Sequence, residues 1–506
     1  MAAVDAARQP ASHDISPRRS KGPALAVVAL LAAVAGALGG WLMPRGPVTT
    51  AQAVVTLVVC LSLGVAAGWL TRSRWVLLVA PLAFVTAYEL LRLRVDGPTL
   101  GAPRLGDIYG VMALVVGRGV DALLTVLPML VGAGWGLLLA RRHTPPDRPG
   151  RVRRVLARGV LAVGSILVLV LVAGLLRPAS TPPVLGPEGT PEAGSIAELT
   201  TVEVGGHEQH LMIRGADASA PVLLFLEGGP GGSALGRMRR SSTDLEGWFV
   251  VVTWDQRGTG KSYPALEPTD TMTVDRMVED TLEVVDHLRE RFGQDRVYLV
   301  GSSWGSVLGV LAVQRRPEVF HAYVGTGQMA DPHETDTLMY ADNLAQARRT
   351  GDTSRVQRLE AMGPPPYTET LDYTAALAGN PEWYDIPYGA DRDPASEYPM
   401  SFLASEYTLL EQLRGMGALA ETYAVLYPQL ADVDLRRDAV SLDVPVYLIQ
   451  GEHEVDGRSV LAREWFELLD APHKEWLDMG HAGHTPPYDD PGEFARLMGE
   501  TVLAET

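Results

Sequence analysis

Hydrophobic and polar residues follow one pattern up to about residue 178 and another beyond it. The first part contains five long apolar runs: Ala24–Met43, Ala51–Leu70, Trp75–Leu91, Gly119–Ala140 and Gly159–Leu176. A helix needs about 20 apolar residues to cross a bilayer, and about 17 is the short limit. This pattern predicts about five transmembrane helices over residues 23–177, preceded by a tail at 1–22.

Short apolar runs replace the long ones after a Pro- and Gly-rich linker at 178–199. The sequence VEVGGHEQHLMIRG alternates around a Gly-Gly pair, which is typical of a hairpin. The runs that follow it are Pro221–Leu226, Trp248–Thr253, Arg296–Val300, Ala322–Val324 and Val444–Ile449. Their length suits buried parallel strands, and amphipathic stretches such as Val274–Phe292 separate several of them. The pattern predicts an open α/β sheet, built from residues 200–330 and 438–506.

The alternation of strands and helices stops at residues 331–437. Helical segments there are interleaved with aromatic and Pro-rich patches such as GPPPYTETLDY. An insertion that leaves an α/β sheet and returns to it is well placed to cover a site at the carboxyl ends of the strands. We interpret this segment as a helical lid, and a second domain with its own core is the alternative.

Charge separates the same two parts of the chain. Residues 1–178 hold 19 Lys or Arg against 7 Asp or Glu, whereas the whole chain has a net charge of −17. Basic residues gather in the tail, in the loop with Arg72 and Arg74, and in the loop 141–158, which predicts that these segments are cytoplasmic. The prediction is a multi-pass cell-membrane protein whose N-terminus is cytoplasmic and whose C-terminal domain is extracytoplasmic. Contact with anionic lipid, and not a nucleic-acid partner, is the favoured role of the basic loop.

Few ionisable residues lie inside the apolar runs. Glu89 is near the end of the third run and Asp121 near the start of the fourth. We interpret both as lying at the membrane surface and the helices as an anchor, with a transporter as the less favoured alternative. Cys60 is the only cysteine, so no disulfide can form within the chain.

The sequence WDQRGTGKSYP at Trp254–Pro264 contains GTGKS, the end of a phosphate-binding loop pattern. The full pattern needs a glycine where this chain has Asp255. A carboxylate at that position repels phosphate, so the pattern argues against nucleotide binding.

The sequence GSSWGS at 301–306 directly follows a predicted strand and precedes a helical stretch. In G-x-S-x-G the serine occupies a sharp turn from strand to helix, where Gly301 and Gly305 let the chain pass closely. Ser303 is therefore the candidate nucleophile. A tight turn that simply needs small residues is the alternative.

A serine nucleophile needs an oxyanion hole and a base. The Gly-rich sequence EGGPGG at 227–232 follows an earlier strand, and the backbone amides of Gly229 and Trp304 are the candidate donors. His481 and His484 lie in MGHAGHTPPYDDP, after the last predicted strand. The chain order of serine, acid and histidine is that of an α/β-hydrolase.

Four of these motifs together carry a resemblance. EGGPGG, DQRGTGKS, GSSWGS and AGHTP resemble HGGPG, DQRGxGxS, GGSWGS and SGHxP of the proline iminopeptidases and related aminopeptidases, which have the α/β-hydrolase fold. The resemblance extends over about residues 200–506 and implies a serine hydrolase with Ser303 as nucleophile, Trp304 as an oxyanion donor and His484 as base. His481 falls outside the motif. Structural roles are implied for Gly228, Pro230, Gly231, Asp255, Arg257, Gly301 and Gly305.

Two positions depart from that family pattern. The family usually has an aspartate three residues after a glycine that ends a strand, whereas Glu454 follows Gly451 here. We favour Glu454 as the acid of the triad, with Asp456 as the alternative. Glu227 replaces the usual histidine, and it could help to receive a substrate's amino terminus or could bind a backbone donor. Acids beside aromatic residues in the lid are further candidates for an amine pocket, with solvated helix acids as the default: Glu397-Tyr398, Glu406-Tyr407 and Trp383-Tyr384-Asp385.

These observations predict a membrane-anchored, extracytoplasmic serine hydrolase. The favoured activity is that of a proline iminopeptidase-type aminopeptidase, which cleaves short peptides through an acyl-enzyme without a metal or an organic cofactor. An esterase or lipase with the same triad is one alternative. A non-catalytic membrane sensor with a degenerate hydrolase domain is another.

Overall fold

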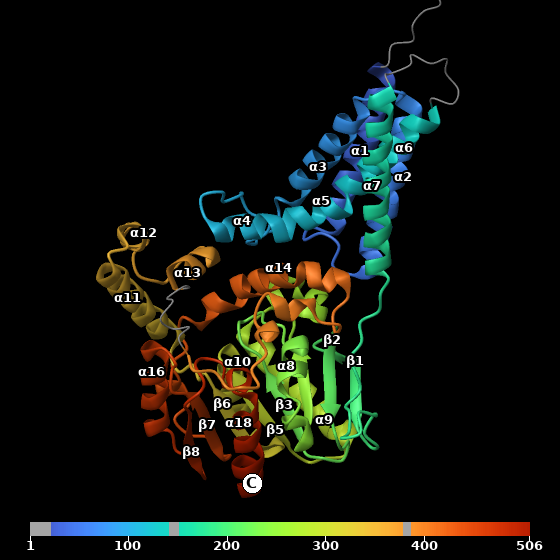
Figure 1. The fold of residues 1–506 in the computed structure, drawn as a ribbon. Helices are drawn as coiled ribbons and strands as arrows, with labels where there is room; N and C mark the ends of the chain where they lie inside the picture. The colour runs from blue at the N-terminus through green and yellow to red at the C-terminus, as the bar shows by residue number, and fades with distance from the viewer. Residues whose placement is uncertain (1–21, 141–150, 378–385) are drawn as a thin grey trace, which may run out of the picture. The chain divides into compact units, whose positions relative to one another are not determined.

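A computed structural model describes residues 22–140, 151–377 and 386–506 (Figure 1). The tail, most of the basic loop and Trp383-Tyr384-Asp385 lie outside these residues. The chain forms two compact units. The first contains the described residues up to Leu42, Leu57–Leu91 and Thr125–Ile166, and the second contains Met43–Thr56, Arg92–Leu124 and Leu167–Thr506.

Apolar helices make up the first unit. They are α1 (Gly22–Leu42), α2 (Thr50–Thr71), α3 (Val76–Arg92), α6 (Val126–Ala140) and α7 (Arg151–Leu175). The start of α2, the last residue of α3 and the end of α7 belong to the second unit. Four helical stretches are long and apolar enough to cross a membrane: Gly22–Leu42, Thr50–Thr71, Ile108–Ala140 and Val152–Leu175. The expected number was five. Helix α3 has 17 residues and so a length of about 25 Å, which is short of the roughly 30 Å of a hydrocarbon core.

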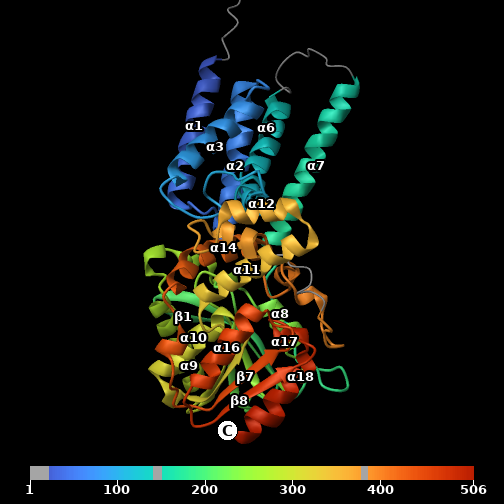
Figure 2. The ribbon, with the colours of Figure 1, turned by 90° about the vertical axis from the view of Figure 1, so that its left-hand side faces the viewer.

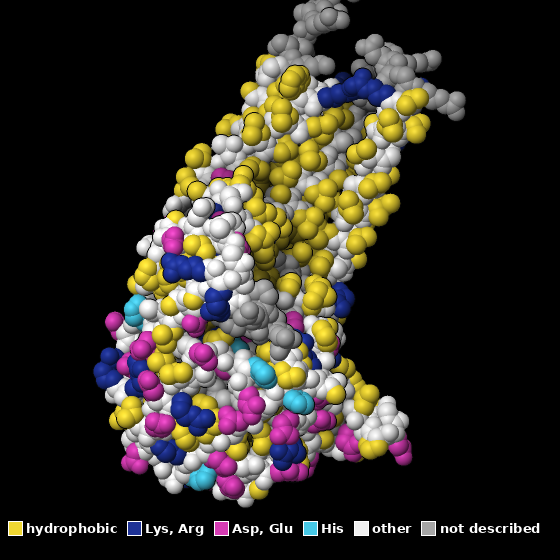
Figure 3. Space-filling model, turned by 60° about the vertical axis from the view of Figure 1, so that its left-hand side comes forward, with side chains coloured by type: hydrophobic (Ala, Val, Ile, Leu, Met, Phe, Trp, Pro, Cys, Tyr) yellow, Lys and Arg dark blue, Asp and Glu magenta, His cyan; other side chains and the backbone are white. Residues whose placement is uncertain are grey.

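Glycine pairs four residues apart bring these helices into close contact. A Cβ at Gly36 would lie 2.1 Å from the carbonyl oxygen of Phe84 in α3, and one at Gly40 would lie 2.4 Å from that of Tyr88. Gly64 of α2 is equally close to the carbonyl oxygen of Met129 in α6. Such small residues let helix backbones approach each other, as is common in membrane helices. Figure 3 shows hydrophobic side chains over the N-terminal helices and charged side chains gathered on the C-terminal domain.

An eight-stranded sheet forms the centre of the second unit, in the order β1-β2-β4-β3-β5-β6-β7-β8. Strand β2 is antiparallel to β1 and β4, and the remaining pairs are parallel. The predicted hairpin is β1 and β2, which Gly205 and Gly206 join. The predicted apolar runs are β3 to β7, and β8 was not predicted. The strands are β1 (Ile196–Val204), β2 (His207–Gly215), β3 (Val222–Leu226), β4 (Val250–Asp255), β5 (Val297–Ser302), β6 (Phe320–Thr326), β7 (Val446–Gly451) and β8 (Lys474–Met479).

Helices cover both faces of this sheet, which explains why its central strands are apolar throughout. On one face the core includes residues of α9 (Val274–Phe292), α10 (Trp304–Arg315) and α16 (Asp456–Leu468). On the other face it includes residues of α8 (Leu235–Ser241) and α18 (Pro491–Leu497). Figure 2 shows α16 and α18 on either side of β7 and β8. The topology and both layers are those of the α/β-hydrolase fold.

The insertion between β6 and β7 is helical. Its helices are α11 (Pro332–Thr350), α12 (Thr353–Met362), α13 (Thr370–Leu377), α14 (Leu409–Leu426) and α15 (Leu435–Asp438). Tyr340, Leu359 and Ala376 form a small core of their own within α11 to α13. Ala418 and Leu426 of α14 instead join the core that packs on the sheet. Helix α14 is thus anchored in the main domain.

Candidate active site

Ser303 lies on the sharp turn between β5 and α10. Its φ angle is +54°, and Arg72 is the only other non-glycine residue with a positive φ in the described ranges. Such a conformation costs about 1–3 kcal/mol and is typical of functional sites. A Cβ at Gly301 would lie 2.4 Å from the carbonyl oxygen of Gly305, and a Cβ at Gly305 would lie 2.1 Å from that of Leu226. The turn therefore requires a glycine on each side of the serine.

Hydrogen bonds to the backbone hold this turn in place. The amide of Ser303 donates to the carbonyl oxygen of Thr326 at the end of β6 (3.0 Å). Ser306 Oγ donates to the carbonyl oxygen of Ser303 (2.6 Å) and accepts from the amide of Met329 (3.0 Å). Ser303 Oγ itself lies 3.7 Å from the Met329 sulfur. Among the described residues the hydroxyl has no oxygen or nitrogen acceptor, so it is available to a base.

His484, which is partly exposed, pairs with the buried Glu454, and the two lie on the loops that follow β8 and β7. Glu454 Oε2 lies 2.5 Å from His484 Nδ1, and its Oε1 accepts from the amide of Val455. Burial alone would raise the pKa of Glu454, but the His484 imidazole and Arg458, at 3.5 Å, outweigh it and hold the pKa at about 2. Asp456 instead begins α16, and its charge raises the pKa of Asp342 on α11, after the larger effect of burial. The imidazole is therefore oriented by Glu454.

Asp489 shapes the loop that carries His484. Its carboxylate accepts from the amides of Gly483 (3.0 Å) and Thr485 (3.1 Å), the residues on either side of the histidine. Gly327, directly after the Thr326 that receives the Ser303 amide, packs against the imidazole: a Cβ there would lie 2.9 Å from Nδ1. Ser303 and His484 thus flank the same short segment after β6.

The Gly-rich loop lies directly beside the serine. A Cβ at Gly228 would lie 3.0 Å from the Ser303 Cβ. The amides of Gly229 and Trp304 donate to no protein acceptor in the described part of the chain, so both remain available to an oxyanion. Gln256 connects the two segments: its Nε2 donates to the carbonyl oxygen of Glu227, and its Oε1 accepts from the Trp304 indole, each at 3.0 Å. Sequence reasoning missed this role, although Gln256 belongs to the DQRG motif.

Glu227 is buried and fully engaged within the domain. Its Oε1 accepts from the Gly228 amide at 2.9 Å, and its Oε2 accepts a short hydrogen bond from the Tyr488 hydroxyl. The Arg237 guanidinium lies 3.9 Å from this carboxylate and stacks over the Tyr488 ring at 3.5 Å. These contacts match the backbone-binding alternative for Glu227 more closely than a role in receiving substrate.

The remaining DQRG residues tie loops together under the site. Asp255 accepts from the Lys261 amide (2.8 Å) and the Tyr407 hydroxyl (3.1 Å), and burial raises its pKa to about 7. Arg257 pairs with Asp280 (2.7 Å) and donates to the carbonyl oxygen of Gly205. These contacts stabilise the loops under the site.

Acids of the lid differ in their surroundings. Glu406 is buried and pairs with Arg239 at 2.6 Å, and Glu397 is half-exposed and lies near Arg237 and Arg392. Asp336, which sequence reasoning did not single out, is only 4% exposed. It accepts from the Tyr427 hydroxyl at 2.8 Å, and burial raises its pKa to about 7.

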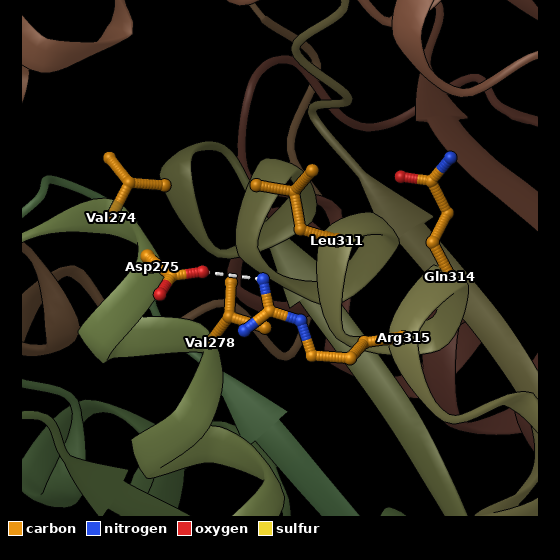
Figure 4. Close-up of a pocket in the computed structure, with 6 residues that line it drawn as sticks. All are labelled: Val274, Asp275, Val278, Leu311, Gln314 and Arg315. Carbon is orange, nitrogen blue, oxygen red and sulfur yellow. Dashed lines mark hydrogen bonds and ion pairs between the residues drawn. The ribbon is translucent and has the colours of Figure 1, made fainter.

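Other candidate groups lie apart from the triad. His481 is exposed and lies near Asp490. The backbone amide of His453 donates a hydrogen bond to the carbonyl oxygen of Ala482. One group of three possible metal ligands occurs in the described ranges, His473, Glu475 and Glu505, and it includes no triad residue. Figure 4 shows a surface hollow of about 530 Å³ between α9 and α10, bridged by Asp275 and Arg315. None of the catalytic candidates lines it.

Comparisons with known proteins find similarity over the hydrolase part of the chain. A family model described as the alpha/beta hydrolase fold matches residues 221–350. The chain is 29% identical to the probable aminopeptidase YbaC of Bacillus subtilis (strain 168) over 314 residues, which are 61% of this chain and 97% of that protein. It is 36% identical to a probable proline iminopeptidase of Leptolyngbya boryana over 96 residues, which are 19% of this chain and 28% of that one. A solved structure of a proline iminopeptidase-related protein from Thermus thermophilus is 24% identical and has a TM-score of 0.43, with 61% of this chain and 98% of that one covered.

Proposed function

We propose, from the α/β-hydrolase fold of residues 196–506, that this chain is a serine hydrolase of the proline iminopeptidase type. The observation that carries the proposal is the combination of Ser303 on a strained turn with the pairing of His484 and the buried Glu454. A histidine oriented by a carboxylate is what activates a serine hydroxyl.

The mechanism follows from these groups. His484 takes the proton of Ser303 Oγ as the oxygen attacks the substrate carbonyl, and the amides of Gly229 and Trp304 stabilise the oxyanion. Collapse of the tetrahedral intermediate breaks the C–N bond, and His484 gives its proton to the departing amine. Water, deprotonated by the same imidazole, then releases the acyl group and restores Ser303. Glu454 stays ionised throughout and stabilises the imidazolium.

Asp336 is the residue we assign to the free amino group of a peptide substrate. It lies on α11 in contact with Tyr427, whose ring stacks on Tyr423 at 4.3 Å. The charge of Arg458 lowers the pKa of both Asp336 and Glu454, so the two carboxylates share a charged neighbour. A buried carboxylate beside aromatic rings favours a cation, because the rings and the carboxylate both attract positive charge.

Substrate preference tests the proposal. Wild-type protein should cleave aminoacyl arylamides, and Ser303→Ala should abolish this activity and the labelling by a fluorophosphonate probe. Asp336→Asn should raise KM at least tenfold for substrates with a free amino group and leave N-acetylated analogues unchanged. Glu360→Gln, an exposed lid acid that pairs with Arg348, serves as the matched control. Cleavage of short acyl esters but of no arylamide would replace the peptidase with an esterase.

We further propose that the apolar helices span a membrane and that the hydrolase domain lies outside the cell. Four of them have the required length and composition. The orientation rests on the charges of the connecting segments, because basic residues gather in the tail, in the loop with Arg72 and Arg74 and in the loop 141–158, which favours the cytoplasmic side for all three. Protease added to intact cells should degrade the hydrolase domain, and complete protection would contradict this orientation.

A further inference from the structure

Helix α14 of the lid has two buried faces with different contacts. Arg414 and Glu421 are seven residues apart and so lie on one face, two turns from each other. Leu419 and Thr422 lie on another. The first face contacts segments that adjoin the apolar helices, and the second contacts the Gly-rich loop and the DQRG turn. All of these segments belong to the second unit.

Glu421 is held by two N-terminal segments at once. It is 1% exposed, and one carboxylate oxygen accepts from the amide of Thr99 (2.9 Å) and from its hydroxyl (2.5 Å). The other oxygen pairs with Arg45, which lies three residues after the end of α1. Arg45 also pairs with Glu267 at 2.8 Å. No side chain fits at Gly97, where a Cβ would lie 2.0 Å from Glu421 Oε2.

Arg414 is held in a second cluster on the same face. Its Nη2 donates to Asp121 Oδ1 at 2.6 Å, and its Nε donates to the carbonyl oxygen of Pro47 at 3.2 Å. Asp121 in turn accepts from Arg92, the last residue of α3, at 2.8 Å. Asp121 is 6% exposed and lies between two arginines. A buried ionic group whose partner is removed is strongly unfavourable, so the clusters fix α14 firmly.

A second face of α14 packs against the catalytic loops. Thr422 Oγ1 donates to the carbonyl oxygen of Gly258 at 2.6 Å. A Cβ at Gly231 would lie 2.7 Å from the carbonyl oxygen of Leu419, so the Gly-rich loop packs directly on the helix backbone. At the start of the helix Glu411 pairs with Lys261 at 2.9 Å. A shift of α14 would therefore displace the loop that carries Gly229.

We infer that the segments 43–48 and 92–121 are part of the active-site structure and do not serve only as connections within a membrane anchor. Arg45, Asp121, Arg414 and Glu421 are positioning residues: they set the place of α14, and α14 sets the place of the oxyanion loop. Because oxyanion stabilisation acts in the transition state, their loss should lower kcat more than it raises KM. For its kinetic readout the inference rests on the proposed serine hydrolase activity.

The test compares variants of the full-length protein in detergent. Glu421→Gln should lower kcat about tenfold or more with KM changed less than threefold, and Asp121→Asn should act in the same direction. Thr99→Val, which keeps both charges and the amide bond to Glu421, should give a smaller loss. The control is Glu360→Gln, because it removes an exposed ion pair from the same lid. The double variant Arg45→Met/Glu421→Met should lose less activity than the product of the losses of Arg45→Met and Glu421→Met, because no buried charge is left unpaired: Glu267, the other partner of Arg45, is half-exposed.

Hydrogen exchange of the amides at 409–426 provides a readout that needs no activity. Exchange in Glu421→Gln should be at least tenfold faster than in the wild type, while amides of β5 keep wild-type protection and so show a folded core. Wild-type kcat together with wild-type exchange in both Glu421→Gln and Asp121→Asn would overturn the inference and leave the proposed function intact. A wild-type protein that neither labels at Ser303 nor cleaves any substrate would overturn the proposed function, and the exchange result would still decide the place of α14.

Discussion

Replacing Glu454 by Gln should lower kcat by at least about a hundredfold. His484, Arg458 and the Val455 amide together lower the Glu454 pKa from 4.5 to about 2 against the effect of burial, which favours the charged carboxylate by about 3 kcal/mol. The share of this energy that comes from His484 is available when the imidazole carries the proton of Ser303, and a loss approaching about 3 kcal/mol slows the reaction by about 10²-fold. A glutamine that donates its N–H to Nδ1 also selects the wrong tautomer, which can extend the loss to about 10⁴-fold.

Steady-state kinetics with an aminoacyl arylamide, together with the rate of fluorophosphonate labelling at Ser303, measure this loss. Asp456→Asn is the matched control, since it removes a carboxylate two residues away that does not contact the imidazole, and its kcat should stay within threefold of the wild type. Glu454→Asp keeps the charge and should retain intermediate activity. A Glu454→Gln protein with kcat within threefold of the wild type would refute the reasoning, as would a larger loss in Asp456→Asn.

The same pair makes a prediction for stability against pH. A carboxyl group whose folded pKa is depressed stabilises the fold above its unfolded pKa, here about 4.5, and this contribution is lost as the pH falls toward 2. Thermal unfolding should therefore show Glu454→Gln less stable than the wild type at pH 6, with the difference shrinking at pH 3. An equal difference at both values would contradict the assigned pKa.

Three other side chains give separate tests. Gln256→Leu leaves the Trp304 indole N–H unpaired, and it should lower the free energy of unfolding in denaturant by about 1–3 kcal/mol and kcat by about tenfold. An unchanged kcat would rule out the role of Gln256 in connecting the two segments. Burial raises the pKa of Asp336 to about 7, so the fold loses stability as the pH rises from about 4 to 7. Asp336→Asn should therefore raise Tm at pH 8 and leave Tm unchanged at pH 4. An equal change in Tm at both pH values would contradict the raised pKa. Arg257→Met removes one partner of the buried Asp280 and should cost about 3 kcal/mol, with partial recovery in Arg257→Met/Asp280→Leu.

The buried strands were predictable from sequence, and the edge strand β8 was not. Strands β3 to β5 are buried at every position because helices cover both faces, and this gives the continuous apolar runs. Strand β8, KEWLDM, is half-buried at the edge of the sheet and mixes charged and apolar residues, so no run marks it. The apolar run of α3 led to the prediction of a fifth transmembrane helix, but a run of 17 residues is at the limit of what can cross a bilayer.

Motif spacing located Ser303, His484 and the glycines around them, because a strained turn and a close approach leave few choices of residue. It could not place side chains whose role depends on partners far away in the sequence. In the sequence Glu421 is indistinguishable from an ordinary surface acid of a helix, because its partners Thr99 and Arg45 lie more than 300 residues away. Asp336 and Asp489 likewise carry no local signal, since burial and not a motif distinguishes them.

The pairing of Arg45 with Glu421 should leave a record in the evolution of such proteins. A substitution at either position leaves the other residue as a buried charge without its partner, which is unfavourable. Substitutions at 45, 99 and 421 should therefore occur together, as should those at 92, 121 and 414. Hydrolases of this fold that lack the N-terminal helices have no reason to keep an acid at the position of Glu421. The N-terminal region and the lid are therefore expected to be inherited as one unit, and exchange of either between distant lineages should give inactive chimaeras.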